Sequence, residues 1–258
     1  MTAQKRSEPI EDVPISIALV SGARLESFHL DTLHAVTALE PSLDVAPNSA
    51  SSKIYLRGIG SQGNAGMDQS VSTFIDGIYH GRSRHTGLAL FDVDRIEVMR
   101  GPQGALHGMN SSAGAIAIHT RRPVLGDAHG HVAASASDHS GRDVTIVLNR
   151  PVTSELALRV VGDYARSDGP WEMVDAATGA RTGAGGGRES EALRASLRWQ
   201  PSGTASVVLK MERQRLDQTN PYAWQPGRCG NLYGLGLGSQ AELDRFWTST
   251  GATEASPL

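Results

Sequence analysis

Residues 92–123 read DVDRIEVMRGPQGALHGMNSSAGAIAIHTRRP, and this stretch decides the fold of the first half of the chain. Its RIEVM run alternates so that Ile96 and Val98 share one face, which predicts a strand with a buried side. Its AIAIHT run repeats the pattern with Ile116 and Ile118. The segment between the two runs is rich in Gly and holds one Pro, which favours tight turns. Two strands joined by a turn-rich connection therefore form the centre of the predicted domain.

Upstream of this centre, the sequence predicts three further strands or bends and one helix. Lys53–Arg57 alternates as a strand, and Val71–Tyr79 reads as a strand interrupted at Asp76-Gly77, where glycine permits a positive φ. Val13–Val20 is a β-branched run that predicts another short strand. Arg24–Leu39 has apolar residues at helical spacing and predicts a single helix. The first half of the chain is thus expected to be an α+β domain.

Four motifs in this half resemble the plug domain of TonB-dependent outer-membrane receptors. They are RGIGS at Arg57–Ser61, DGIY at Asp76–Tyr79, RIEVMRGPQG at Arg95–Gly104 and GAIAI at Gly114–Ile118. The resemblance implies a plug domain over residues 8–123, which acts as a gate and ligand platform inside a transport barrel.

After Pro123 the pattern changes to segments of about ten residues that alternate apolar and polar, which is typical of transmembrane β-strands. The clearest segments are 155–164, 191–199 and 205–212, with two weaker ones near His131–Ser137 and Arg142–Asn149. A soluble β-sandwich shows the same alternation, but the upstream resemblance favours a barrel.

The predicted fold class is therefore an α+β plug domain followed by antiparallel β-strands of an incomplete transmembrane β-barrel. Residues 124–258 are expected to be the N-terminal part of that barrel, with about five strands, too few to close it. Arginines such as Arg159 and Arg194 recur on one face of these strands and fit a wet lumen. Gly183–Gly187 reads as a flexible loop between two strands.

The resemblance assigns a latch between plug and barrel to Arg57, Glu97 and Arg100. In family plugs, arginines at the two RG positions pair with glutamates of the barrel wall, which would come from later strands. We therefore expect Arg57 and Arg100 to lack strong partners inside the plug itself. Glu97 is two residues from Arg95 on one strand face, so it is a nearer partner for that arginine.

Three loops are candidates for contact with a transported ligand. Gly63 and Asn64 lie in the stretch that resembles the apical plug loop, and Arg82, Arg84 and His107 lie in two further loops. Backbone N–H groups of Gly-rich loops together with arginines suit an anionic ligand such as a ferric chelate. An ordinary polar loop is the alternative for each of these residues.

Several function classes find no support in the composition or motifs. A net charge of −3 gives no nucleic-acid footprint, and no run of about 18 apolar residues predicts a membrane helix. No nucleotide, nucleophile-elbow or zinc-protease motif predicts an enzyme, and no cofactor is expected. His80, His85 and His107 have no metal-ligand spacing, so no metal site is expected. The role of the single cysteine, Cys229, stays open.

Both ends of the chain look cut relative to the family. The start has no signal peptide, and Thr2-Ala3 resembles the tail of the box that the inner-membrane TonB protein binds. We expect in-frame DNA upstream to encode the rest of that box and an export signal.

The resemblance implies a fragment of an outer-membrane receptor that imports a scarce nutrient, most commonly a ferric siderophore, with energy supplied through TonB. The expected partners are therefore TonB, such a ligand and the outer membrane, and no nucleic acid. A soluble ligand-binding or interaction protein built on a free plug domain is the alternative, as is a non-functional gene fragment.

Overall fold

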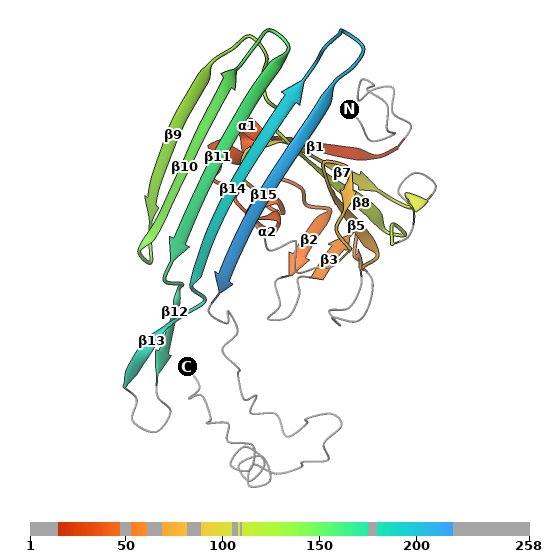
Figure 1. Cartoon of the computed structure of the whole chain (residues 1–258). Coiled ribbons are helices and arrows are strands. Elements are labelled where there is room, and N and C mark those ends of the chain that lie inside the picture. The colour runs from red at the N-terminus through yellow and green to blue at the C-terminus, as the bar shows by residue number, and fades with distance from the viewer. Residues whose placement is uncertain are drawn as a thin grey trace.

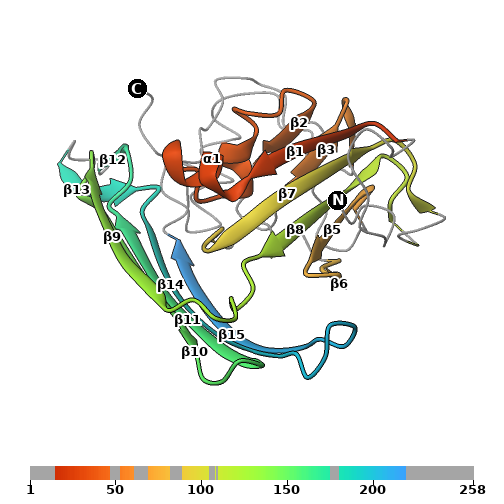
Figure 2. The same ribbon diagram turned by 90° about the horizontal axis from the view of Figure 1, so that it is seen from above.

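A computed structural model describes residues 15–46, 53–60, 69–81, 89–104, 108, 110–174 and 180–218. The described chain forms two parts, an N-terminal α+β domain and a long five-stranded C-terminal sheet that curves around it (Figures 1 and 2). In this described part, no helix is long and apolar enough to cross a membrane.

Two helices and fifteen strands make up these parts. They are β1 (Ile17–Ser21), α1 (Gly22–Ser27), α2 (Leu33–Val36), β2 (Leu43–Ala46), β3 (Lys53–Leu56), β4 (Ile59–Gly60), β5 (Val71–Ile75), β6 (Ile78–Tyr79), β7 (Val93–Arg100), β8 (Gly114–Thr120), β9 (His129–Ser137), β10 (Gly141–Pro151), β11 (Leu156–Ser167), β12 (Trp171–Val174), β13 (Arg181–Gly185), β14 (Arg188–Trp199) and β15 (Val207–Gln218).

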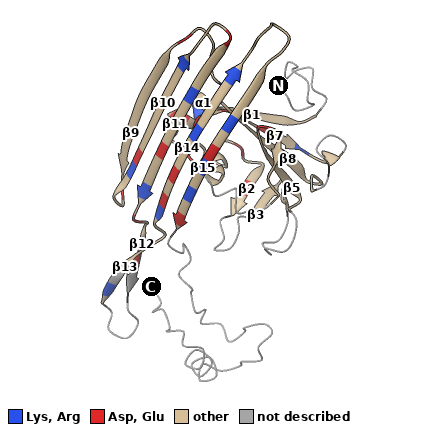
Figure 3. Ribbon diagram, in the orientation of Figure 1, with Lys and Arg blue, Asp and Glu red and all other residues tan. Residues whose placement is uncertain are grey.

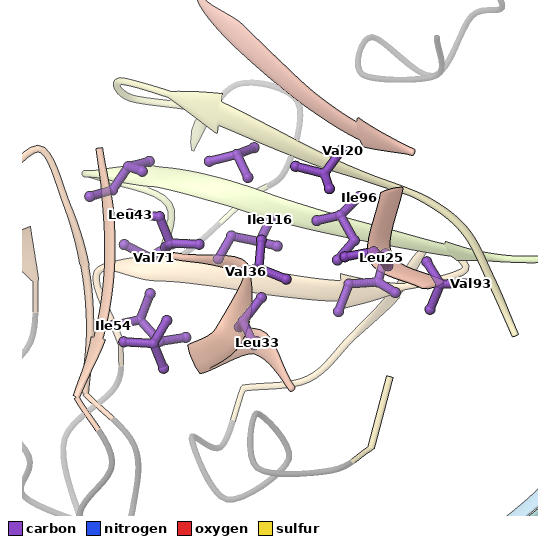
Figure 4. Packing of buried hydrophobic residues seen from close by; sticks show 14 of the residues in the cluster. Val20, Leu25, Leu33, Val36, Leu43, Ile54, Val71, Val93, Ile96 and Ile116 are labelled. Carbon is purple, nitrogen blue, oxygen red and sulfur yellow. The ribbon is translucent and has the colours of Figure 1, made fainter. Parts of the chain in front are cut away.

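The N-terminal domain is built on a mixed sheet with strand order β1-β7-β8-β5-β6. The two strands predicted from RIEVM and AIAIHT are its central β7 and β8, which pair antiparallel. Ile96, Val98, Ile116 and Ile118 face the main core, as predicted. Figure 4 shows Ile96 and Ile116 in that core. A second small sheet, β2-β3-β4, and the helices cover that core from the other side.

The RG and DG motifs form the same local structure. Arg57 and Gly58 have φ values of 53° and 77° and link β3 to β4, and Asp76 and Gly77 have values of 48° and 83° and link β5 to β6. Two successive positive φ values are typical of the two-residue hairpin turn whose twist matches its strands. The bend predicted at Asp76-Gly77 is confirmed, whereas the strand predicted to reach Arg57 ends one residue earlier.

The helix predicted over Arg24–Leu39 is wrong as a single element. The chain forms two short helices, because His29 takes a left-handed φ of 51° after α1 and breaks the backbone pattern. Thr32 then starts α2, its hydroxyl accepting a hydrogen bond from Ala35 N at 3.2 Å. Leu33 stays buried as predicted, but Phe28 is 59% exposed.

The C-terminal sheet has the order β15-β14-β11-β10-β9, and each strand pairs antiparallel with its neighbours. All five predicted strands are present, and most are longer than predicted because their ends continue past the alternating apolar residues. The loop predicted at Gly183–Gly187 is partly wrong, since Gly183 to Gly185 belong to β13, which pairs with β12 in a separate hairpin.

The two faces of this sheet differ in the way the alternation predicted. Arg159 and Arg194 lie on the concave face and are buried against the N-terminal domain. The convex face exposes large apolar side chains, among them Val132, Ile146, Leu148, Leu193, Leu209 and Met211.

Candidate functional site at the junction of domain and sheet

The strongest polar contact between the two parts joins Asp92 to Arg159. Asp92 immediately precedes β7, and its carboxylate accepts hydrogen bonds from Arg159 Nε at 2.8 Å and Nη2 at 2.6 Å. The Asp92 side chain is fully buried and that of Arg159 is 3% exposed. A bidentate pair of this kind fixes orientation as well as distance, so it sets how the domain sits on β11.

Arg194 on β14 binds the same segment through the main chain. Its Nη1 donates to the carbonyl oxygen of Phe91 at 3.1 Å, and its guanidinium lies 4.1 Å from the centre of the Phe91 ring. Its Nε donates to Glu212 on β15 at 2.7 Å. Phe91 itself packs against apolar side chains of the sheet, namely Val147, Val161 and Ala192. Phe91-Asp92 is therefore an anchor that the domain inserts into the concave face.

A second contact uses the DG turn. Asp76 accepts hydrogen bonds from Thr120 N at 2.8 Å and Thr120 Oγ1 at 2.6 Å, and it pairs with Lys210 on β15. Burial raises the pKa of the Asp76 carboxyl, but the hydrogen bonds and the charge of Lys210 outweigh burial and hold that pKa below its ordinary value. The same carboxylate thus closes the turn and ties it to the sheet.

The segment that leaves the domain is held by a third set of bonds. Asn149 on β10 accepts from Val124 N at 2.9 Å and donates to the carbonyl oxygens of Val124 and Asp127 at 3.0 and 2.7 Å. Arg198 on β14 donates to the Pro123 carbonyl at 3.3 Å. These bonds fix the passage from the domain to the first strand of the sheet.

The two predicted latch arginines lie together but bind within the domain. Arg100 donates to Glu40 at 2.7 Å, to Ser42 Oγ at 2.9 Å and to Ser16 Oγ at 3.1 Å. Arg57 also donates to Ser16 Oγ, at 3.2 Å. Our expectation that Arg100 lacks a strong partner inside the domain is therefore wrong, because Arg100 forms an ion pair with the buried carboxylate of Glu40.

Glu97 pairs with Arg95 on one face of β7, as the spacing predicted. Arg95 Nε lies 2.9 Å from Glu97 Oε1, and His119 Nε2 lies 3.6 Å from Glu97 Oε2. The Glu97 side chain is fully buried in the domain. A role for Arg57, Glu97 and Arg100 toward other strands of a barrel stays a prediction.

The hydrogen-bond partners of Glu40 keep its buried carboxyl group ionised. Burial by itself raises its pKa, but the hydrogen bonds from Arg100 and Ser42 and the charge of Arg100 outweigh burial, and the pKa lies below its ordinary 4.5. A carboxyl whose pKa is lower in the folded than in the unfolded state stabilises the fold above its unfolded-state pKa. That contribution is lost as pH falls through the folded-state pKa.

Replacing Glu40 with Gln is expected to lower the free energy of unfolding at pH 7 by about 1.5–3 kcal/mol, since charged hydrogen bonds to Arg100 are lost. The variant should also lose less stability than the wild type when pH falls below 4.5. Unfolding midpoints recorded from neutral to acid pH check both effects. Arg57→Gln is the matched control, with a loss under about 1 kcal/mol at an exposed position. Equal losses for the two variants would show that the Glu40 pair has no special weight.

The remaining predicted site residues lie outside the described part of the chain. These are the ligand-loop residues Gly63, Asn64, Arg82, Arg84 and His107, the box residues Thr2 and Ala3, and Cys229. Their roles stay predictions.

The anchor was missed by sequence reasoning. Arg159 and Arg194 were placed on the correct face but interpreted only as lumen residues, and no role was predicted for Asp92. The register brings them together, because Val161 on β11 pairs with Arg194 on β14, which puts Arg159 and Arg194 close on one face. The available signal was a pair of arginines on one face of the C-terminal strands together with a carboxylate next to a central strand of the N-terminal domain.

Residues 9–115 match the family described as the TonB-dependent receptor plug domain. The chain carries the plug of a TonB-dependent receptor. The match spans the first three motifs and ends inside β8, at the start of the fourth motif, so the plug is the N-terminal domain. The C-terminal sheet corresponds to strands of the receptor barrel.

Curated relatives and solved structures agree with this assignment. The pesticin receptor of Yersinia pestis is 28% identical over 182 residues, which are 69% of this chain and 26% of that protein. The ferrioxamine receptor of Yersinia enterocolitica is 22% identical over 242 residues, which are 91% of this chain and 31% of that protein. The chain thus spans about a quarter to a third of the length of these relatives.

The crystal structure of the ferric yersiniabactin uptake receptor from Yersinia pestis superposes with a TM-score of 0.72 at 24% identity, covering 84% of this chain and 34% of that one. The ferric-catecholate import receptor of E. coli K12 gives a TM-score of 0.65 at 20% identity, covering 83% and 29%. At these identities the similarity establishes the fold: a plug held against antiparallel barrel strands.

Proposed function

We propose that this chain is the plug and first barrel strands of an outer-membrane receptor that imports a ferric siderophore with energy from TonB. The observation that carries the proposal is the buried contact in which Phe91 and Asp92 of the plug bind Arg159 and Arg194 of the sheet. It holds the plug on the concave, polar face of a sheet whose other face is apolar. A plug held in this way closes the lumen until it is displaced.

The convex face supports a place in a membrane. The exposed apolar side chains of this face form a band across the strands. Toward the end of the sheet that meets β12 and β13, the band ends on each strand at a charged residue. These residues are Arg142 on β10, Arg166 on β11, Glu191 on β14 and Arg213 on β15. Arg166 pairs with Glu189, and Glu191 pairs with Arg215, so the edge of the band moves two residues along the strand at each of the last two steps.

This drift gives the angle between the edge of the band and the rows of paired residues that run across the strands. Four residues at ~3.4 Å, crossed over three strand spacings of ~4.8 Å, correspond to roughly 40°. Barrel strands tilt by about 35–45°, so an apolar band parallel to the membrane plane must cross the hydrogen-bonded rows at that angle. A soluble sheet gives no reason for such a slanted edge.

The names of the relatives support a proposal for the cargo. A ferrioxamine receptor and a ferric yersiniabactin uptake receptor are among them, and a vitamin B12 transporter of Vibrio vulnificus is 24% identical over 218 residues. A ferric siderophore is the cargo that these names favour, with cobalamin as the other outcome of the test.

Inactivating the gene that contains this chain is expected to abolish growth on one ferric siderophore under iron limitation. Growth on an iron source that does not depend on this receptor should be unchanged. A panel of siderophores and cobalamin, combined with fractionation of the membranes, makes the measurement. A product found only in the soluble fraction, or a deletion strain that grows normally on the whole panel, would contradict the proposal.

A further inference from the structure

Lys210 on β15 lies between two carboxylates, one on the plug and one on its own strand. Its Nζ pairs with Asp76 Oδ2 in the DG turn and lies 3.8 Å from Oε2 of Glu212, two residues further along the same face of β15. Basic and acidic positions follow one another along β14 and β15 in Figure 3. One ammonium group thus has two alternative acidic partners.

Glu212 is at the same time a partner of the anchor. The oxygen that Lys210 approaches, Oε2, also accepts a hydrogen bond from Arg194 Nε at 2.7 Å. Oε1 accepts a hydrogen bond from Gln214 at 2.8 Å. Arg194 in turn donates to the carbonyl oxygen of Phe91. The Glu212 carboxylate therefore connects the ammonium group that binds the DG turn to the guanidinium group that binds the anchor.

Asp76 keeps Lys210 from binding Glu212 at full strength. Two hydrogen bonds from Thr120 orient the Asp76 carboxylate, and Lys210 lies within hydrogen-bond distance of it. The 3.8 Å between Lys210 and Glu212 exceeds that distance, and a shift of Nζ by about 1 Å would close the gap. Lysine has three rotatable donors on a flexible stem, so a small shift of this kind costs little.

A cavity of about 30 Å³ between plug and sheet gives these side chains room to move. Its polar lining comes from both parts of the chain, and it includes Thr73, Thr120, Arg194, Glu212 and Gln214. A cavity of this size can hold at least one water molecule. The Glu212 carboxylate can therefore turn from Arg194 toward Lys210 without displacing an apolar side chain.

We propose that Lys210 is a two-position switch that releases the anchor after the DG turn has left the sheet. With Asp76 in place, Lys210 is held by the plug, and the Glu212 carboxylate stays with Arg194. When Asp76 moves away, Lys210 binds Glu212 instead. The side chain of Arg194 is 4% exposed, so it then holds a buried charge without a full carboxylate partner, and its bond to the Phe91 carbonyl weakens. The plug therefore leaves the sheet in a fixed order, with the DG turn first and the anchor second.

The test measures how often the anchor leaves the sheet. Ala192 packs against Phe91 and is 8% exposed. A cysteine at this position should react with a water-soluble thiol reagent only while the anchor is detached. The parent protein is the whole receptor that contains this chain, extracted in mild detergent, with Ala192→Cys and its natural cysteines replaced by serine.

Asp76→Asn is expected to raise the labelling rate at least about threefold over the parent, because Lys210 then binds Glu212. Lys210→Met should label at the parent rate, since nothing competes with Arg194 for the carboxylate. The double variant D76N/K210M should also label at the parent rate. That variant separates the switch from any loosening of the DG turn inside the plug.

Asp94→Asn is the matched control for loss of a carboxylate near the anchor. Asp94 is two residues from Asp92, but its side chain binds Arg95 and has no contact with Lys210 or Glu212. The labelling rate of this variant should equal that of the parent.

Glu212→Gln tests the same step without a change in the plug, and it keeps the test available if Asp76→Asn does not fold. It should label at least as fast as Asp76→Asn, and adding D76N to it should have no further effect. Equal acceleration by Asp76→Asn and Lys210→Met would mean that the two contacts only add their strengths, which overturns the switch. A rate for Asp76→Asn equal to the parent, or an acceleration that persists in D76N/K210M, also overturns it. These outcomes leave the import of a siderophore untouched, because growth on the siderophore panel tests that function separately.

Discussion

Replacing Asp92 with Asn is expected to lower the free energy of unfolding of the plug and sheet together by about 3–5 kcal/mol, the usual result of breaking a buried ion pair from one side. Arg159 is 3% exposed and loses the carboxylate that compensates its charge. Urea unfolding in detergent measures the loss. Asp94→Asn is the control two residues away, because that carboxylate is half exposed and its bond to Arg95 is on the surface. Its loss should stay under about 1 kcal/mol.

A second pair of variants separates the charge from the packing. Asp92→Leu combined with Arg159→Met should recover most of the stability that Asp92→Asn removes, since apolar replacements of a whole buried pair are often neutral or stabilising. If the double variant is as unstable as the single one, the carboxylate acts through something other than Arg159.

Replacing Gly114 with Ala is expected to cost about 3 kcal/mol or more, because strain and overpacking act together. Gly114 has a φ of 155°, and an added Cβ would lie 2.4 Å from both the Met99 carbonyl oxygen and the Leu56 side chain. The loss should appear as a lower thermal unfolding midpoint. Gly104→Ala, in the RGPQG motif, meets nothing within 4 Å and should cost under about 1 kcal/mol. Similar losses at both glycines would contradict this explanation.

The sequence predicted the elements better than the contacts between them. Strands such as β7 and β8 were predictable because Ile96, Val98, Ile116 and Ile118 alternate, and alternation reports burial directly. The helix was mispredicted because the spacing of apolar residues gives no information on the backbone angles of one residue, His29, whose φ is positive. The register between β11 and β14 is set by long-range pairing, so the meeting of Arg159, Arg194 and Asp92 could not be read from local pattern.

The partner of Arg100 could not be predicted from the family resemblance either. The resemblance directed attention to glutamates of the barrel, whereas Glu40 lies 60 residues upstream and only the folded domain brings it to 2.7 Å. Glu97 was predictable because its partner is two residues away on one strand. The local prediction for Glu97 was thus confirmed, whereas the expectation for Arg100, which depended on the three-dimensional neighbourhood, was wrong.

The hydrogen bonds of Ser16 determine how the first strand responds to a force applied to the N-terminal segment. Its hydroxyl accepts from Arg57 and Arg100, and its carbonyl accepts from Arg100 N at 2.9 Å, directly before β1 pairs with β7. A slip of β1 by one residue turns its side chains to the opposite faces and presents isoleucine to both arginines. Sliding by small steps is therefore unfavourable, and the first strand is either in register or detached. Tension below the detachment threshold is carried by the strand without altering the domain, so release at this position is a threshold event.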